Sequence, residues 1–284
     1  MPSDYTHLYF GRRAIDFLPE SFASAVKKHR QLFNIGLQGP VILFFYEPLH
    51  KCPINQIGYA MHDASAKDFF YPAREILNTQ FSKDSAPALA YLAGFLCHYT
   101  LDTTCHNYIE KKMEVSGLTH SELEKEFDRY LMVKEKGAVS KIKSSTEIVP
   151  SIENAKVISA FFPNVFAKDI LKALKSMVVF TNLLSGKGIR RPLVTAGLKI
   201  SGQYDKLFDM LIPKDTPAGS EDSNLRLEKL LDKALTLYGE YAQEYEIFLH
   251  GGDFPNSLIA TFGVSDGWEE IPILTLEEEK NYEV

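Results

Sequence analysis

Apolar residues recur every three to four positions along most of the chain, the spacing that places them on one face of an α-helix. Segments with this pattern lie at residues 14–36, 57–81, 86–113, 120–136, 152–162, 167–184 and 224–249. The chain is therefore predicted to be all-α, with a single domain over residues 1–266. The acidic stretch that follows, residues 267–284, is a candidate for a disordered tail.

One short apolar run, GPVILFFYEP at residues 39–48, lacks a clear helical period. Its length would suit a strand, but no segment around it has the alternation expected of a partner strand. We therefore expect a buried helical turn at this position.

Residues that start and stop helices support two of these predictions. Pro87 is suited to the first turn of the helix that follows it. Ser116 or Thr119 can cap the next helix, and Gly137 is placed to end it.

The charge of the chain narrows the classes of partner. The 284 residues carry a formal net charge of −6, with an isoelectric point near 5.8. Such a balance argues against nucleic-acid binding driven by phosphate neutralisation. It does not exclude a phosphate-ester substrate, because bound cations would supply positive charge that this sum omits.

Cysteine usage and the N-terminal residues favour a cytoplasmic protein. The three cysteines, Cys52, Cys97 and Cys105, do not have the dense spacing of a disulfide scaffold. No signal peptide is recognisable after Met1, and no apolar run approaches the roughly 20 residues needed to cross a bilayer.

Histidine and carboxylate residues are concentrated between residues 98 and 124. His98, Asp102 and His106 follow one another at intervals of four, and His120 and Glu124 are again four apart. Residues four apart lie above one another on the same helix face. Imidazole and carboxylate groups are ligands for zinc and similar divalent ions, so this pattern predicts a metal site.

Each pair also has a simpler interpretation. A hydrogen bond within one helix would explain His98 and Asp102, and a solvated helix face would explain His120 and Glu124. A single histidine on an apolar helix is more often a core residue than a ligand. The occurrence of all five groups within 27 residues favours metal binding over these separate explanations.

Several motifs along the first half of the chain occur in a recognisable order. They are THLYFGRRAID (6–16), GLQGP (36–40), YAMHD (59–63), CHYTLD (97–102), CHNYIE (105–110) and HSELEKEFDRYL (120–131). Together they resemble the zinc-dependent phospholipase C family of Gram-positive bacteria, which is related in fold to the single-strand-specific zinc nucleases. The motifs span about residues 2–135; the rest resembles short intracellular members only in length and helical character.

This resemblance implies a multi-helix bundle with up to three zinc ions in a cleft between helices. It implies hydrolysis of a phosphodiester by a zinc-bound water. Carried over position by position, the metal ligands would be His7, His62, His98, Asp102, His106, His120 and Glu124. In the family the carboxylate at the Asp102 position bridges two ions.

The chain departs from the family pattern at two positions. Val41 stands where the family has an aspartate that is both a ligand and the proposed general base, so no protein general base is assignable. Glu47 and Asp63 are near in sequence, but their spacing supports neither as a substitute. The second departure is the N-terminus, where the Pro2 backbone amine would replace the tryptophan amine that ligates zinc in secreted relatives.

The predicted function is therefore hydrolysis of a phosphodiester, with a phospholipid as one candidate substrate. The alternatives are a soluble phosphodiesterase or nuclease-like hydrolase, and a catalytically impaired relative that binds metal, because of Val41. Nucleic acid is not an expected partner. The sequence is compatible with peripheral membrane contact through a basic run, Lys187, Arg190, Arg191 and Lys199. It does not indicate an oligomeric state.

Overall fold

The computed structural model describes residues 4–137, 147–184, 216–217 and 219–284, and among these residues it is all-α. The only β-type pairing in the described part is one isolated bridge between Ser65 and Thr261. None of the described helices is both long and apolar enough to cross a membrane. The basic run at residues 187–199 and Pro2 lie outside the described residues.

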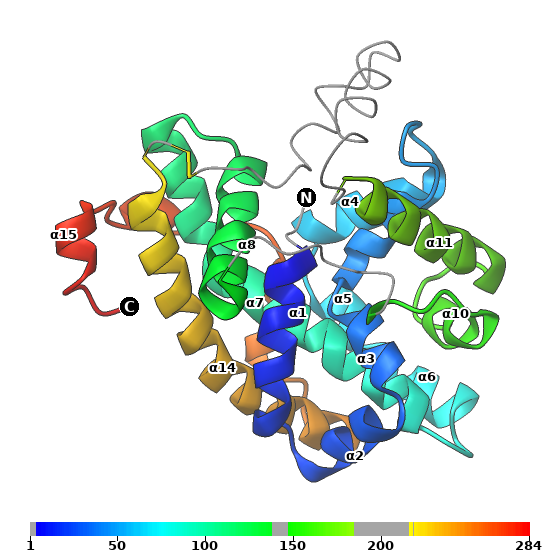
Figure 1. The fold of residues 1–284 in the computed structure, drawn as a ribbon. Helices are drawn as coiled ribbons and strands as arrows, with labels where there is room; N and C mark the ends of the chain where they lie inside the picture. Colours follow the sequence, from blue (N-terminus) through cyan, green and yellow to red (C-terminus); the bar gives the residue numbers. More distant parts are fainter. Residues whose placement is uncertain (1–3, 138–146, 185–215, 218) are drawn as a thin grey trace.

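A long central helix, α7 (Ala86–Ser116), organises the molecule (Figure 1). It is apolar around nearly its whole circumference in its first half, which is typical of a helix buried on all sides. Pro87 lies in its first turn, as expected, and Gly117 ends it in a left-handed conformation with φ of 72°.

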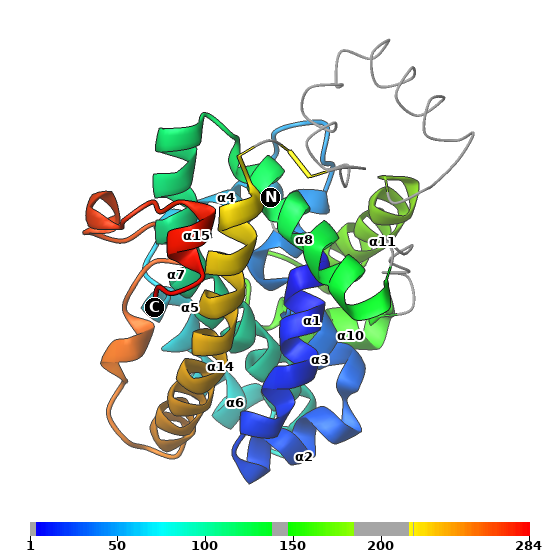
Figure 2. The same ribbon diagram turned by 60° about the vertical axis from the view of Figure 1, so that its left-hand side comes forward.

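Four helices form the most extensive contacts with α7 (Figures 1 and 2). They are α1 (Asp4–Ala14), α2 (Glu20–Lys28), α3 (Arg30–Gly36) and α14 (Glu221–Leu249). The contact with α3 is especially close, because a Cβ atom on Gly94 would lie only 2.1 Å from the Phe33 carbonyl oxygen. Glycine is therefore required for this approach.

The apolar run after α3 forms a buried 3₁₀ helix, η2 (Gly39–Phe45), which confirms the predicted helical turn. It packs against α4 (Pro53–Asp63) and α7. Gly39 has a φ of 52°, and a Cβ atom there would lie 2.1 Å from Cδ2 of His98. This turn therefore needs glycine both for its backbone conformation and for the space that the His98 ring occupies.

The remaining elements complete the shell around the core. They are α5 (Lys67–Phe70), α6 (Ala73–Gln80), α8 (His120–Lys136), α10 (Ile152–Ser159), α11 (Ala167–Leu184), α15 (Leu276–Glu279) and the 3₁₀ helices η1 (Ile15–Phe17), η3 (Asn256–Leu258) and η4 (Trp268–Glu270). Thr119 begins α8 with a capping box, and Gly137 ends it at a φ of 69°. One cluster of buried apolar side chains extends from Tyr5 to Phe262. The domain boundary at residue 266 stays a prediction.

The acidic tail at residues 267–284, a candidate for disorder by its sequence, instead folds back onto α14 in the structure. The Arg226 Nη2 atom lies 2.7 Å from Oε1 of Glu279, and both side chains are buried. The Lys229 ammonium group donates to the Tyr282 carbonyl. These contacts explain the difference, because a buried guanidinium group needs a buried partner.

Candidate metal centre

Three of the predicted ligands lie on one face of α7. His98, Asp102 and His106 are each separated by one helical turn, and their exposed fractions are 0%, 3% and 6%. Ionisable groups are rarely buried this deeply without a partner. The neighbouring helices provide these partners.

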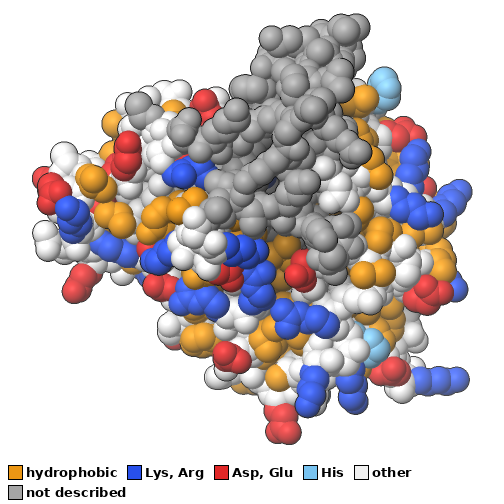
Figure 3. Space-filling model, in the orientation of Figure 1, with side chains coloured by type: hydrophobic (Ala, Val, Ile, Leu, Met, Phe, Trp, Pro, Cys, Tyr) orange, Lys and Arg blue, Asp and Glu red, His pale blue; other side chains and the backbone are white. Residues whose placement is uncertain are grey.

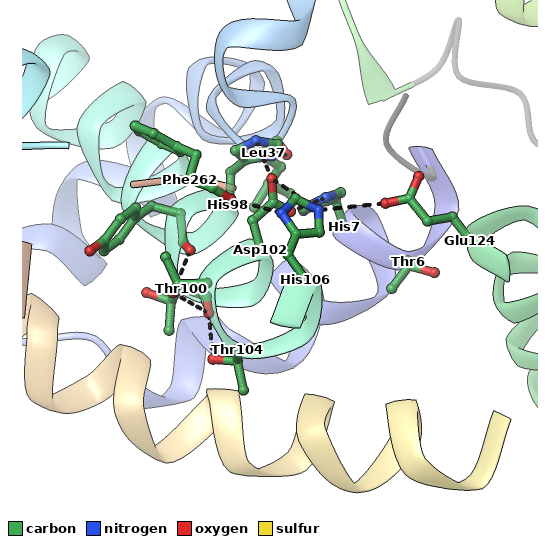
Figure 4. A network of polar contacts seen from close by, with 12 residues as sticks. Thr6, His7, Leu37, His98, Thr100, Asp102, Thr104, His106, Glu124 and Phe262 are labelled. Carbon is green, nitrogen blue, oxygen red and sulfur yellow. Dashed lines mark hydrogen bonds and ion pairs between the residues drawn. The ribbon is translucent and has the colours of Figure 1, made fainter. Parts of the chain in front are cut away.

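The first group joins α7 to α1. The Asp102 carboxylate has Oδ1 at 3.2 Å from Nε2 of His7 and Oδ2 at 3.1 Å from Nε2 of His98. The two imidazole rings are stacked with centroids 4.4 Å apart (Figure 4). Asp128, on α8, holds the start of α1 by accepting hydrogen bonds from the backbone and hydroxyl of Thr6, each at 2.8 Å.

The second group joins α7 to the start of α8. Nε2 of His120 lies 2.9 Å from Oε1 of Glu124, and Nε2 of His106 lies 3.8 Å from the same oxygen. The capping box at Thr119 fixes the first turn of α8, on which His120 stands. The sequence spacing of four within each helix therefore becomes one cluster between two helices.

Asp102 connects the two groups. Its Oδ2 atom, which faces His98, is also 4.0 Å from Nε2 of His106, while Oδ1 faces His7. The Asp102 carboxylate thus faces histidines of both groups, which is the position that a bridging ligand would need. Figure 4 shows Asp102 beside the histidines, with a dashed line from Glu124, on α8, to His106.

Backbone carbonyls orient three of the histidine rings. Nδ1 of His98 is 3.1 Å from the Leu37 carbonyl oxygen, and Nδ1 of His106 is 2.8 Å from that of Phe262. Nδ1 of His62 is similarly 3.1 Å from the Gly58 oxygen. A carbonyl only accepts hydrogen bonds, so each Nδ1 must be the donor. This leaves Nε2 as the ligand atom, an arrangement that is usual for metal-binding histidines.

His62 is near the cluster but belongs to neither group of converging ligand atoms. Its ring is half-buried on α4, with its centroid 6.5 Å from that of His98 and 5.3 Å from that of Phe44. Its role as a ligand stays a prediction.

Several buried polar atoms of the two groups have no hydrogen-bond partner. They are His7 Nδ1 and Glu124 Oε2, together with His98 Nε2 and Asp102 Oδ2, which lie 3.1 Å apart but do not form a hydrogen bond with each other. Orphaned atoms of this kind are rare in folded proteins, and an ion is one of the groups that can satisfy them. The donor set of imidazole nitrogens and carboxylate oxygens is also the one that zinc prefers, so the residues fit the metal.

The charges of the metal-free cluster are strongly coupled. Burial alone would raise the pKa of Asp102 and Glu124, but the surrounding histidines hold both well below the usual range. Burial lowers the pKa of His98 to about 4, whereas for His106 the opposing attraction of Asp102 and Glu124 raises it to about 9. Two ionised carboxylates are thus buried together, which favours a bound cation.

The position of the missing family aspartate is filled by a buried apolar side chain. Val41 is 1% exposed within η2. Neither neighbouring acid replaces it in the two groups, because Asp63 is exposed and Glu47 forms an exposed ion pair with Lys172. The general base therefore stays unassigned.

The cysteines near the ligands are packing residues in this structure. Cys97 is fully buried, Cys105 is 7% exposed, and burial raises the pKa of both thiols. No sequence signal marks the carbonyls of Leu37, Gly58 and Phe262 as orienting groups, because every residue has a backbone carbonyl.

Fold and site together define a class, the all-helical metalloproteins with a buried cluster of histidines and carboxylates. The comparison with protein families is more specific: the zinc-dependent phospholipase C model matches residues 6–175. The match covers more than half of the chain and includes every predicted side-chain ligand. The chain therefore belongs to this family. Neither curated proteins nor solved structures provided a match.

Proposed function

We propose that this protein is a zinc-dependent hydrolase of phosphodiesters, with the headgroup bond of a phospholipid as its leading candidate substrate. One observation carries the proposal: two ligand groups, buried except for the partly exposed His120, are joined by a single carboxylate, Asp102. Family membership supports metal-dependent hydrolysis in general, and the substrate is the finer part of the proposal.

Each ligand group would hold one ion. His7, His98 and Asp102 form the first site, and His106, His120 and Glu124 form the second. Zinc, when bound, lowers the pKa of water and neutralises charge on a phosphate. A third ion would need His62 together with ligands outside the two groups, so two ions are the stoichiometry that this geometry favours.

The chain itself would contribute positioning and a low-dielectric environment. A cavity of about 20 Å³ beside both groups has Thr6, Asp102, Cys105, His106 and Glu124 among its lining residues. This is room for about one water-sized group. The ionised carboxylates would fix the charge of the site, and the carbonyl-bound imidazoles would fix its ligand directions.

A second candidate function is metal binding without turnover. It is favoured by Val41, which is buried where the family has a ligand and proposed base. A soluble phosphodiester is the third possibility and would require no membrane contact. Nucleic-acid binding gains no support from the charges of α1 and α8, since Arg12 pairs with Glu135 and Lys134 pairs with Glu228. On the face drawn in Figure 3, blue basic side chains occur together with red acidic ones.

The test combines metal content with turnover. Protein purified without chelators is expected to hold about two zinc ions per chain and to hydrolyse phosphatidylcholine in vesicles. Hydrolysis of a chromogenic phosphodiester or single-stranded DNA alone would instead indicate a soluble substrate. Zinc without any turnover would favour the metal-binding alternative, and protein that binds no zinc would refute the proposal.

Asp102→Asn should abolish most of this activity. Loss of a residue that only hydrogen-bonds to a metal ligand typically lowers metal affinity or activity by about 10–100-fold. Loss of a bridging ligand is expected to have a larger effect. The matched control is Asp222→Asn, because Asp222 is also buried and ion-paired, with Lys112, but lies outside the ligand groups. Zinc content and turnover should both fall in the first variant and only stability in the second.

Val41→Asp tests whether residue 41 limits the site. The new carboxylate would be buried, so it should destabilise the metal-free protein and increase the stabilisation that zinc provides. Zinc content and turnover should rise if the position limits activity. Unchanged values of both would show that residue 41 is irrelevant to the reaction.

A further inference from the structure

The candidate centre is bordered by a segment from the far end of the sequence, outside the region that matches the family. Residues 259–265, here called the C-terminal loop, follow η3 and lie beside α4 and α7. The family match ends at residue 175, so it provides no role for this loop.

The loop contacts two predicted ligands through its backbone. The Phe262 carbonyl accepts the Nδ1 hydrogen bond of His106 at 2.8 Å. The next residue, Gly263, donates its amide to the carbonyl of His62 at 3.0 Å. A single peptide group, the one that joins Phe262 to Gly263, therefore binds one histidine of α7 and one of α4.

The Phe262 side chain adds a packing surface for the same residues. It is 1% exposed, and its ring centroid lies 6.3 Å from those of both His62 and His98. The ring also packs edge-to-face on Tyr99, with centroids 5.1 Å apart. Figure 4 shows Phe262 beside His98.

Both ends of the loop are anchored independently of these contacts. On the α4 side, Ser65 Oγ donates to the Ile259 carbonyl and the Ala66 amide donates to Ala260. On the α7 side, the Ser265 amide donates to Oδ1 of Asn107 at 2.8 Å. The position of Phe262 is thus set before any metal is considered.

We propose that the C-terminal loop is a positioning element of the metal centre and that Phe262 is its positioning residue. By accepting the Nδ1 hydrogen, the Phe262 carbonyl holds His106 in the tautomer and direction that leave Nε2 free. The Phe262 ring and the Gly263 amide limit the movement of His62 towards or away from the cluster. This inference rests on the metal centre of the proposed function, but not on its reaction.

The test compares two equally buried phenylalanines. Phe262→Leu replaces the aromatic ring that the loop packs against the histidines by a smaller side chain. Phe248→Leu makes the same change on α14, away from the ligands. Both phenylalanine side chains are 1% exposed. Zinc affinity is measured by competition with a chelator, and ligand geometry by the visible spectrum of the cobalt-substituted protein. Both variants should unfold at a lower temperature than the wild type.

Only Phe262→Leu should weaken zinc binding, by about 10–100-fold, and change the cobalt spectrum. Equal effects of both variants, or an unchanged affinity and spectrum in Phe262→Leu, would overturn the positioning role. Hydrogen exchange of the wild type gives a second test that needs no variant: zinc should slow exchange of the Gly263 amide, and an unaffected rate would contradict the proposal. If wild-type protein binds zinc but hydrolyses nothing, the proposed reaction is refuted and the positioning role of the C-terminal loop is unaffected.

Discussion

Two histidines on one face of α7 have opposite electrostatic environments. Burial lowers the pKa of His98 to about 4, and the carboxylates Asp102 and Glu124 overcome burial to raise that of His106 to about 9. In the unfolded chain both would titrate near 6.5. The metal-free protein should therefore lose stability both when the pH is lowered and when it is raised.

The sign differs for each residue. Between about pH 6.5 and 4, the unfolded chain binds more protons than folded His98 does, so stability falls as the pH falls. The contribution of His106 is fully present below about pH 6.5 and is lost as the pH rises through about 9. Unfolding temperatures of chelator-treated protein should show this, and His106→Gln should remove the alkaline decrease. A wild-type profile without that decrease would contradict the assignment.

Zinc competes with the proton on His106, which gives a separate expectation for binding. Because the metal needs a neutral imidazole, zinc affinity should rise by roughly tenfold per pH unit between about pH 7 and 9. Calorimetric titrations in buffers of different ionisation enthalpy would count the released proton. In the His106→Gln variant this proton should be absent.

At the scale of elements, the first turn of α8 connects helix capping to the metal site. Thr119 and Thr275 begin α8 and α15 with identical capping boxes, but only α8 carries predicted ligands. Replacing either threonine by alanine should cost about 1 kcal/mol of unfolding free energy. Thr119→Ala alone should also weaken zinc binding, because His120 directly follows the cap.

Urea unfolding and zinc titration of both variants measure these effects. If Thr275→Ala weakens zinc binding as much as Thr119→Ala does, the effect of the cap is on global stability and not on the site.

The helices and the ligand pairs within them could be predicted from the sequence because both depend on local spacing. The pairs His98–Asp102 and His120–Glu124 need only one helical turn to form. The approach of His7 to Asp102 depends on how α1 packs on α7, and only the family resemblance indicated it. No sequence signal marks the Phe262 carbonyl, and Glu279, the buried partner of Arg226, is one of several acidic residues in the tail.

At the scale of the whole molecule, the centre ties together segments that are distant in the chain. The two ligand groups come from α1, α7 and α8, and the C-terminal loop adds a fourth segment. Metal should therefore stabilise the complete fold and not one helix. At free zinc about 1,000 times the dissociation constant, one site contributes about 4 kcal/mol, or roughly 10 °C in unfolding temperature.

Calorimetry before and after removal of zinc by a chelator tests this expectation. Magnesium, which prefers oxygen ligands, should restore little of the lost stability. A melting temperature that does not respond to zinc would show that the groups do not hold the metal in the folded protein.

The contact between Gly39 and His98 has a consequence for how this chain can vary. Residue 39 forms the wall of the space for the imidazole ring, and the wall fits because it has no side chain. Even alanine would require the ring or the turn to move, so as long as residue 98 is histidine, residue 39 has to be glycine. Gly39 binds no metal, yet its identity is as restricted as that of a predicted ligand. The residues that the metal site requires therefore include one whose role is to leave room for the His98 ring.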